Sequence, residues 1–225
     1  MKTLIILRLA LAVSFALVLI AQTSARLDVG EVPSNNAALA SGFIFTGDYT
    51  KQDVVYFQTN LEWLRTVLPE WYQYFMDARP VTFNFDSQVA ARGHAAEANC
   101  CDESGAGIVR FGYHFGQLDD PTDPSGRSSE ARRITFFGQV AHELTHIRDA
   151  RAGSWTDVPV RRKCLTAELS GLGKQLEIKQ DLLRTSLTET SPVAEAYRAR
   201  LEHQINVETK RLHNRSFLDA YCGNL

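Results

Sequence analysis

The sequence has little of what marks several large classes of protein. Its 24 Lys and Arg and 26 Asp and Glu leave a net charge of −2, which gives no indication of nucleic-acid binding. Beyond residue 20, no segment is apolar enough to cross a bilayer, and there is no internal repeat or low-complexity tract. What remains is 225 residues of ordinary globular composition, enough for one domain with a sizeable core or two small ones at most.

Cysteine is also scarce. The chain has four, at positions 100, 101, 164 and 222, and they form no Cys-x-x-Cys pair of the kind that binds zinc. An even number of cysteines in an exported chain predicts two disulfides. Because a bond between neighbours would strain the peptide that joins them, we expect Cys100 and Cys101 each to pair with Cys164 or Cys222, in an order that the sequence leaves open.

The first 25 residues predict export. Lys2 and Arg8 flank the start of an apolar run that reaches Ile20, and small residues follow up to Ala25. This is the pattern of a signal peptide over residues 1–25, cleaved after Ala25. The alternative is an uncleaved anchor, but Arg8 interrupts the run and leaves an apolar segment too short to span a bilayer. We therefore expect a secreted or periplasmic protein with no stable membrane anchor.

The rest of the chain predicts a single domain over residues 48–225, after a loose mature N-terminus over residues 26–47. Apolar residues at spacings of three and four predict helices over about 48–78 (the second part beginning at Pro69), 131–150, 164–187 and 191–220. Alternation predicts strands over 81–85 and 107–115, and residues 117–129 read as a long surface loop. Gly171 and Gly173 interrupt one helix, which either weakens that prediction or marks close packing. Together these elements predict an α+β domain, mainly helical, with a small β-sheet.

The stretch that carries the chemistry is His142-Glu143-Leu144-Thr145-His146. On a helix, residues four apart lie one turn above each other, so His142 and His146 can present two imidazole nitrogens to one metal ion. Glu143 projects from nearly the same face and can take a proton from a metal-bound water. The alternative is a helix whose two histidines are simply packed or solvated and whose glutamate has no chemical role.

A catalytic zinc site of this kind needs a third protein ligand. Glu168 is our first choice, because it lies on the next predicted helix and completes a His₂Glu set. Asp149 follows His146 by three residues and is more naturally an orienting partner of a histidine. The remaining alternatives are Asp157, Glu177 and Glu195.

The strand predicted over residues 107–115 precedes the predicted helix that carries His142 and His146, and it could line a substrate cleft by backbone pairing. Tyr113 or His114 at its end could then stabilise an oxyanion, but both residue types are more often structural in such a position. His94 and Glu97 could be metal ligands, but their spacing does not demand it, and we expect neither to bind metal.

The H-E-x-x-H segment and the segment around Glu168 together resemble those of the zincin metallopeptidases, and more narrowly of their gluzincin branch. Val140-Ala-His-Glu-Leu-Thr-His146 is similar to the active helix of the thermolysin type, and a glutamate follows in Thr166-Ala-Glu-Leu-Ser-Gly171. The resemblance covers roughly residues 107–180. It implies a zincin-like fold, zinc bound by His142, His146 and Glu168, and Glu143 as general base. The chain departs from the family at Leu172, where the family carries aspartate, and has only weak candidates for the family's acid histidine, namely His203 and His213.

The sequence therefore predicts an exported, disulfide-bonded zinc metallopeptidase, a hydrolase acting on a peptide or protein substrate with Zn²⁺ as cofactor. A first alternative keeps the zinc but cleaves another amide, such as a cell-wall crosslink. A second is a non-catalytic zincin-like binding domain, although an intact Glu143 argues against it. A third is a structural helical protein with an accidental motif. The oligomeric state stays open.

Overall fold

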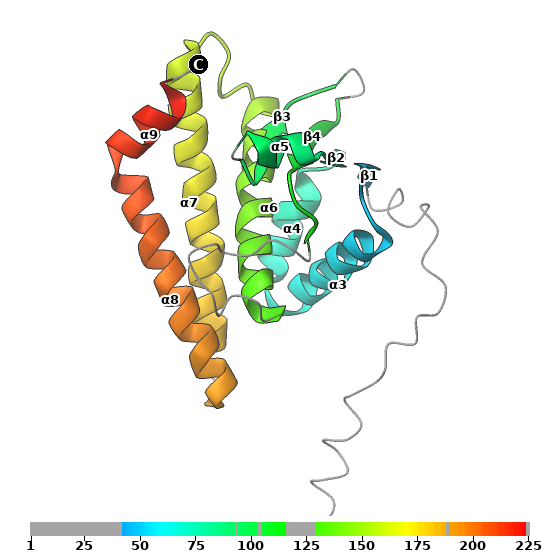
Figure 1. The fold of residues 1–225 in the computed structure, drawn as a ribbon, viewed down its shortest axis with the longest axis vertical. Coiled ribbons are helices and arrows are strands. Elements are labelled where there is room, and N and C mark those ends of the chain that lie inside the picture. Colours follow the sequence, from blue (N-terminus) through cyan, green and yellow to red (C-terminus); the bar gives the residue numbers. More distant parts are fainter. Residues whose placement is uncertain (1–41, 93, 103–104, 116–128, 188–189, 224–225) are drawn as a thin grey trace, which may run out of the picture. The chain divides into compact units, whose positions relative to one another are not determined.

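The computed structural model describes residues 42–92, 94–102, 105–115, 129–187 and 190–223 (Figure 1). The predicted signal peptide and most of the predicted surface loop over residues 117–129 lie outside these ranges. Of the helices within them, none has both the length and the apolar composition that a membrane crossing requires.

The sheet has four strands in the order β1-β2-β4-β3. They are β1 (Phe43–Gly47), β2 (Val81–Phe85), β3 (Ala96–Asn99) and β4 (Gly107–Phe111). β1, β2 and β4 run parallel, with Phe83 paired to both Phe45 and Val109, and β3 runs antiparallel to β4 at the edge. Val81, Phe83 and Phe85 are buried while the residues between them are partly exposed, so the alternation that predicts β2 follows the burial of one face.

Helices account for most of the described residues. They are α3 (Lys51–Val67), α4 (Pro69–Asp77), α5 (Ser87–Ala91), α6 (Ser129–Arg151), α7 (Val160–Ser186), α8 (Pro192–His213) and α9 (Arg215–Cys222). In Figure 1, α6 stands between α7 and the pair α3 and α4, and it also packs on β3 and β4. α7 packs in turn on α8 and α9. The fold is α+β, mainly helical with a small sheet, and this prediction is confirmed.

Residues at the helix ends account for several boundaries. Thr50 caps α3, because its side chain accepts a hydrogen bond from the Asp53 amide at 3.2 Å and the Asp53 carboxylate accepts one from the Thr50 amide at 2.8 Å. Pro69 and Pro192 begin α4 and α8, where a missing amide hydrogen removes no helical bond. Gly153 follows α6 with a φ of 72°, a conformation that favours glycine.

The sheet differs from the sequence prediction in three ways. β1 forms in the last five residues of the segment expected to be loose, because parallel pairing with β2 buries Phe43 completely. The strand predicted over residues 107–115 ends at Phe111, and Tyr113 beyond it is 46% exposed. β3, together with the short α5, occupies residues for which the sequence predicts no element, since a strand of four residues whose apolar side chains are only alanines is too short and too weakly hydrophobic to give a strand signal.

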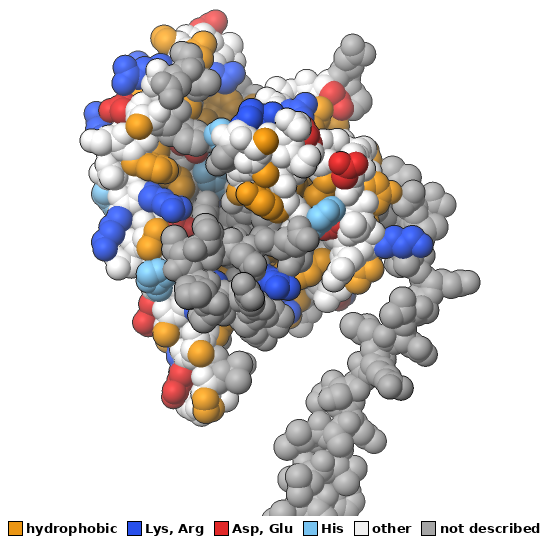
Figure 2. Space-filling model, viewed as in Figure 1, with side chains coloured by type: hydrophobic (Ala, Val, Ile, Leu, Met, Phe, Trp, Pro, Cys, Tyr) orange, Lys and Arg blue, Asp and Glu red, His pale blue; other side chains and the backbone are white. Residues whose placement is uncertain are grey.

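The C-terminal helices also depart from their predicted bounds. α7 begins at Val160 rather than near residue 164. The single helix predicted over residues 191–220 breaks at Asn214, whose side chain accepts a hydrogen bond from the Phe217 amide at 3.1 Å and so caps a new helix, α9. The mixed charge of these helices is visible on the face drawn in Figure 2, where basic and acidic side chains are interspersed with apolar ones.

The structure pairs Cys164 with Cys222 and Cys100 with Cys101. The prediction of two disulfides is confirmed, but the prediction that the neighbours pair elsewhere is wrong. The reason lies in helix packing: α9 lies on α7 and brings the Cα atoms of Cys164 and Cys222 to 5.8 Å, a usual distance for a disulfide. Cys100 and Cys101 lie on the connection between β3 and β4, on different elements from that pair.

One side chain joins the C-terminal end of α6 to the sheet. The Arg151 guanidinium donates hydrogen bonds to the carbonyl oxygens of Ala78, Arg79 (3.2 Å), Pro80 and Gly105 (3.1 Å). These carbonyls lie just before β2 and β4. A cation at the C-terminal end of a helix also interacts favourably with the helix dipole. Arg151 therefore holds α6 against the starts of two parallel strands.

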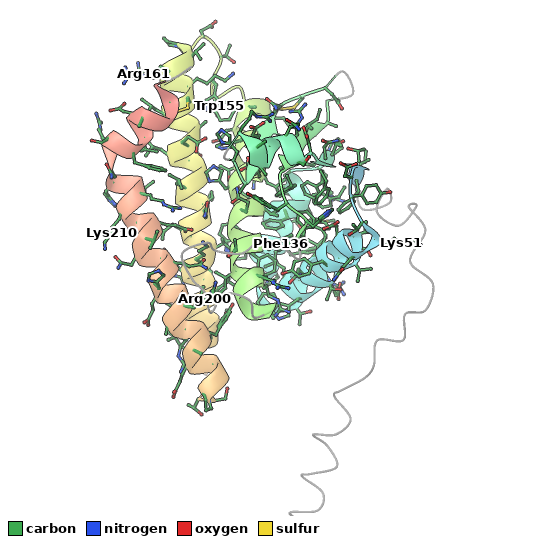
Figure 3. All side chains as sticks on the ribbon, in the orientation of Figure 1. Lys51, Phe136, Trp155, Arg161, Arg200 and Lys210 are labelled. Carbon is green, nitrogen blue, oxygen red and sulfur yellow. A yellow bond between two sulfur atoms is a disulfide. The ribbon has the colours of Figure 1, made fainter. Side chains whose placement is uncertain are left out.

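The core between the sheet and α6 is largely aromatic. The ring centroids of Phe57 in α3 and Phe83 in β2 lie 5.1 Å apart, and those of Phe115 and Phe136 in α6 also lie 5.1 Å apart. All four rings are buried, and Phe136 points from α6 toward α3 (Figure 3). Edge-to-face pairs of this kind add stability beyond the burial of their area. The aromatic rings thus join α3, the sheet and α6 in one packed core.

Replacing Phe83 by alanine should lower the free energy of unfolding by about 3–5 kcal/mol, because the fully buried ring leaves a cavity that its neighbours fill only in part. Phe217→Ala is the matched control. Its ring is 42% exposed on α9, so the loss should stay below about 1 kcal/mol. Urea unfolding of the oxidised protein measures both values, and equal losses would show that Phe83 is not a core residue.

Candidate metal centre

The helix α6 carries both histidines of the candidate site. One stripe of the helix is buried and apolar, which fixes its rotation on the core: Ile134, Phe137, Val140, Ala141 and Leu144. His142 and His146 lie beside this stripe, one turn apart, with ring centroids separated by 4.6 Å. The two residues are only 7% and 9% exposed. The sequence spacing therefore places two buried imidazoles side by side.

Glu168 of α7 lies against the two histidines. Its carboxylate oxygens are 3.5 Å from His142 Nε2 and 3.7 Å from His146 Nε2. Within the described ranges, these three residues form a group that could hold a metal ion, with ligand atoms all within 4.8 Å of one another. Ligand atoms around a tetrahedral zinc ion lie about 3.3 Å apart. The two carboxylate-to-imidazole distances lie close to that spacing, so the residues fit a cation of this size.

The other acidic residues considered as third ligands make their contacts elsewhere. Asp149 accepts a hydrogen bond from Ser170 Oγ at 2.6 Å, which links α6 to α7 beside the site. Glu177 pairs with Lys174 at 2.6 Å on the exposed side of α7. The last two alternatives are exposed, namely Asp157 and Glu195. The group of three described above includes none of these residues.

A glycine of α7 makes room for the first histidine. A Cβ added at Gly171 would lie 2.7 Å from His142 Nε2 and 2.8 Å from two ring carbons, closer than such atoms approach in folded proteins. Gly173, two residues on, faces open space, with nothing within 4 Å of an added Cβ. Close packing of α7 on the imidazole therefore explains the glycine at position 171, and nothing in the structure explains the one at position 173.

The two imidazoles differ on the side away from Glu168. His142 Nδ1 lies 3.1 Å from Gln175 Oε1, which can only accept a hydrogen bond, so Nδ1 carries a hydrogen and donates it. His146 Nδ1 is buried and has no hydrogen-bond partner in the described part of the chain. Its ring lies 6.1 Å from that of Trp155, in the connection between α6 and α7 (Figure 3). The two rings are therefore held in different ways.

Burial and the neighbouring carboxylates set the protonation of the group. Burial lowers the pKa of His146 to about 3, and His142 acts in the same direction. Burial also acts to lower the pKa of His142, but the hydrogen bond to Glu168 and the charges of Glu143 and Glu168 outweigh it and raise that pKa. Burial acts to raise the pKa of Glu168, but its interactions with the two histidines lower it. A carboxylate between imidazole nitrogens is a donor set suited to a divalent cation, which would displace any proton held there.

Glu143 is almost completely buried and is not one of the three ligands. It is 3% exposed and accepts a hydrogen bond from Gln139 Nε2 at 3.0 Å. Burial raises its pKa to about 7, a shift that His142 opposes and that Glu168 and Glu97 assist. A carboxylate whose pKa lies near neutrality is suited to proton transfer at physiological pH.

Two residues that the sequence analysis set aside lie close enough to influence the site. Glu97 on β3 raises the pKa of Glu143, and His94 just before β3 lowers that of Glu168. The packing of β3 on α6 brings them there, and their own spacing gives no such signal. The strand predicted to line a cleft, β4, is paired on both sides and cannot do so, whereas β3 is an edge strand of the sheet.

Residues after β4 make their contacts with α3 instead. His114 Nδ1 lies 2.8 Å from Asp53 Oδ2, and the other oxygen of this buried carboxylate accepts a hydrogen bond from the Phe115 amide at 2.8 Å. Tyr113 is exposed. These contacts agree with the structural role expected for His114. The weak candidates for an acid histidine lie exposed on α8: His203 and His213.

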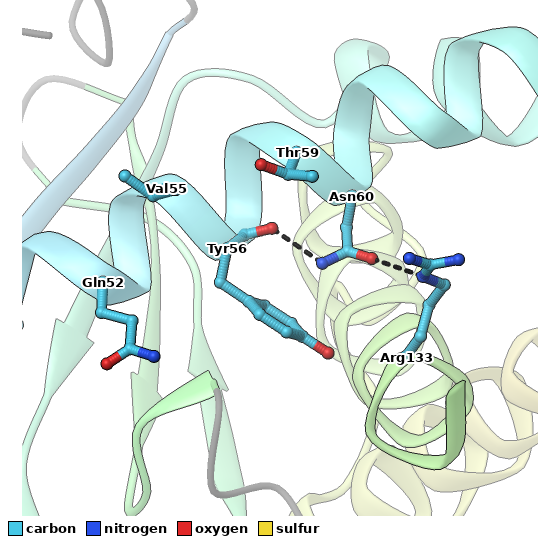
Figure 4. Close-up of a pocket in the computed structure, with 6 residues that line it drawn as sticks. All are labelled: Gln52, Val55, Tyr56, Thr59, Asn60 and Arg133. Atoms are coloured by element: carbon cyan, nitrogen blue, oxygen red, sulfur yellow. Dashed lines mark hydrogen bonds between the residues drawn. The ribbon is translucent and has the colours of Figure 1, made fainter. Parts of the chain in front are cut away.

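A pocket of about 210 Å³ lies between α3 and the start of α6 (Figure 4). Asn60 of α3 links the two walls, because its side-chain oxygen accepts a hydrogen bond from Arg133 Nε of α6 at 2.9 Å, while its amide donates to the Tyr56 carbonyl of its own helix at 2.8 Å. Arg133 precedes His142 by nine residues, or about 13 Å of helix. The lining residues include no histidine, cysteine or acid, so the pocket offers no metal ligands: Gln52, Val55, Tyr56, Thr59, Asn60 and Arg133.

Comparisons of the chain with protein-family models, with curated proteins and with solved structures found no match. The case for a function therefore rests on the geometry and chemistry of the site.

Gly171→Ala should weaken zinc binding by at least about tenfold, because the added methyl group displaces the His142 ring. Gly173→Ala is the control on the same helix. It should leave the zinc affinity unchanged and raise the free energy of unfolding by about 1 kcal/mol, since alanine is the better helix former. Competition with a chromophoric chelator measures the affinity. Equal affinities of the parent and Gly171→Ala would contradict the placement of His142 in a metal site.

The raised pKa of Glu143 predicts a loss of stability with rising pH in chelator-treated protein. This carboxyl titrates near 4.5 when unfolded and near 7 when folded. Below 4.5 it is protonated in both states, and between 4.5 and 7 the unfolded state loses its proton first, so the group destabilises the fold increasingly until the effect is complete above 7.

Glu143→Gln removes this pH-dependent contribution to the free energy of unfolding. The variant should gain about 2–3 kcal/mol more over the parent at pH 8 than at pH 5. Urea unfolding at the two pH values measures the difference, with Glu177→Gln on the exposed side of α7 as control. A gain of the same size at both pH values would show that burial does not raise this pKa.

Proposed function

We propose that the chain is a zinc-dependent metallopeptidase of the zincin type, a hydrolase that cleaves peptide bonds. The observation that carries the proposal is the position of Glu168, which lies 22 residues beyond His146 in the sequence and yet meets both histidines at metal-ligand spacing. An accidental H-E-x-x-H would not be expected to gather a carboxylate over the same two nitrogens. Two imidazoles and a glutamate, with one position left for water, are a ligand set of catalytic zinc.

Each residue of the site has a separate role in the proposed hydrolysis. A bound zinc ion supplies Lewis-acid polarisation of the scissile carbonyl and lowers the pKa of water. His142, His146 and Glu168 hold and orient that ion. Glu143 takes the proton of the attacking water and delivers it to the leaving amine nitrogen. A pKa near 7 suits a carboxylate that has to accept a proton and then give it up.

The edge strand β3 supports a peptide as the substrate. Among the described residues it pairs with β4 on one side only, and it packs on α6. An extended peptide can add to such an edge through backbone hydrogen bonds, with little regard to its sequence. Glu97 of β3 is close enough to raise the pKa of Glu143, so a peptide bound at this edge would lie near the candidate site. The role first considered for the strand over residues 107–115 therefore belongs to β3 in this proposal.

The disulfides support the proposed secreted or periplasmic location. Both cysteine pairs of the chain are bonded, and such bonds persist in oxidising compartments.

The alternatives differ from the proposal at identifiable points. A zinc amidase acting on cell-wall crosslinks would use the same ligands and the same base, and would differ in substrate alone. A non-catalytic binding domain has no use for a glutamate buried to 3% exposure beside the ligands, where its charge destabilises the fold. The amidase is therefore the closer rival.

The first experiment is the zinc content of the purified, oxidised protein. The parent should hold one zinc ion per chain, and Glu168→Ala should weaken its binding by more than about 100-fold, because one of three protein ligands is lost. Glu177→Ala on the same helix is the control and should bind as the parent does. A parent without zinc after reconstitution would refute the proposal. Zinc retained by Glu168→Ala would move the third ligand elsewhere.

The activity test separates binding from catalysis. Glu143→Gln should keep its zinc and lose peptide hydrolysis by about 10²–10⁴-fold, since it lacks the base that moves the proton. A panel containing an unfolded protein, short peptides and a cross-linked muropeptide distinguishes peptidase from amidase. Cleavage of the muropeptide alone would favour the amidase, and no cleavage by a zinc-loaded parent would favour the binding domain.

A further inference from the structure

A series of hydrogen bonds connects His142 to a buried ion pair. Gln175 Oε1 accepts the hydrogen of His142 Nδ1 at 3.1 Å, and Gln175 Nε2 donates to Glu208 Oε1 at 2.6 Å. The Lys179 ammonium pairs with the same oxygen of Glu208. These residues come from α6, α7 and α8. The series therefore runs from the candidate metal site into the interface between α7 and α8.

The ion pair lies deep in this interface. Lys179 and Glu208 are 3% and 4% exposed. Removing two charges from water costs about as much free energy as their mutual attraction returns, and apolar residues of similar volume are often at least as stable. A gain in stability therefore does not explain the pair. What the pair does provide is a fixed charge beside the Gln175 amide.

α6 leaves space for both side chains. A Cβ added at Gly138 would lie 2.7 Å from Lys179 Cε and 3.2 Å from Gln175 Cγ. Gly138 is one helical turn before His142. Because this position has no side chain, Lys179 and Gln175 can lie against the α6 backbone next to the imidazole that Gln175 contacts.

We propose that the Lys179–Glu208 ion pair fixes the orientation of the Gln175 amide and thereby holds His142 in the tautomer that binds metal. A carboxylate only accepts hydrogen bonds, so Gln175 turns its NH₂ group toward Glu208 and its oxygen toward His142. That oxygen also only accepts, so it keeps a hydrogen on Nδ1. Nε2, which faces Glu168, can then coordinate a cation that displaces any proton held between them.

The opposite orientation is disfavoured at both ends of the amide. Its oxygen would face the Glu208 carboxylate, two acceptors with no hydrogen between them, and its NH₂ group would face His142 and favour the hydrogen on Nε2. Gln175 is thus a positioning residue, and Lys179 and Glu208 act through it. The inference rests on the proposed function only in taking His142 as a metal ligand.

Nitrogen-15 NMR of the histidine side chains tests this in chelator-treated Glu168→Ala protein, in which no carboxylate faces Nε2, at a pH above the titration of His142. This protein should carry the hydrogen on Nδ1. Adding Lys179→Met/Glu208→Leu replaces the ion pair with apolar residues and should keep the fold but mix the two tautomers, and in the parent the same pair of substitutions should weaken zinc binding by about 10–100-fold. Glu202→Gln, on the exposed side of α8, is the control and should change neither property.

A rescue variant separates orientation from mere packing. Gln175→Glu/Glu208→Gln moves the carboxylate beside His142, where it still accepts only, and keeps Lys179 nearby. It should restore the Nδ1 tautomer and zinc affinity to near the parent values. Glu208→Gln alone should not, because the new amide can face Gln175 with either end.

The two proposals fail in different ways. If the apolar double variant keeps the Nδ1 tautomer and the zinc affinity of the parent, the inference is overturned. A parent that binds no zinc refutes the proposed function instead, and the tautomers measured in the Glu168→Ala protein, which need no zinc, still decide what Gln175 does.

Discussion

The candidate site depends on how closely α7 approaches α6. Its three ligands come from two helices, and the carboxylate oxygens of Glu168 reach 3.5 and 3.7 Å from the imidazole nitrogens only because α7 lies directly on the His142 ring. Gly171 permits that approach, since any side chain there would meet the ring. The hydrogen bond between Ser170 and Asp149 joins the same two helices beside the ligands. The H-E-x-x-H sequence supplies the two histidines, but the distance from them to the third ligand is set by the packing of α7 on α6.

α6 separates two different environments. On the sheet side, its buried face packs into an aromatic core around Phe136. On the α7 side, it meets buried polar groups that continue through Gln175 to Glu208 on α8. Low dielectric strengthens every electrostatic interaction with a bound cation, but it also makes each buried charge costly. Glu143 is the clearest case, because burial raises its pKa to about 7.

Features contained within one element could be predicted from the sequence, while those that need two elements to meet could not. Helical spacing places His142 and His146 together, and alternation gives β2 its bounds. Glu168 could be proposed because the chemistry needs a third ligand, although the packing that brings it there is not encoded locally. Gln175 lies 33 residues from its partner, and β3 has four residues, so neither leaves a periodic signal. The prediction of the cysteine pairing was wrong for the same reason, because the packing of α9 on α7 is a long-range contact.

The four carbonyls that Arg151 binds have a consequence for the geometry of the helix as a whole. Sliding α6 by one turn along its axis moves every side chain by about 5.4 Å and leaves it facing nearly the same direction. Such a slip would leave one of the two imidazoles out of reach of Glu168, yet the apolar stripe resists it only weakly, since one hydrophobic side chain can replace another. Directional hydrogen bonds to the carbonyls of Ala78, Arg79, Pro80 and Gly105 have no equivalent one turn away. Arg151 therefore sets the position of the helix along its axis, from five residues beyond His146.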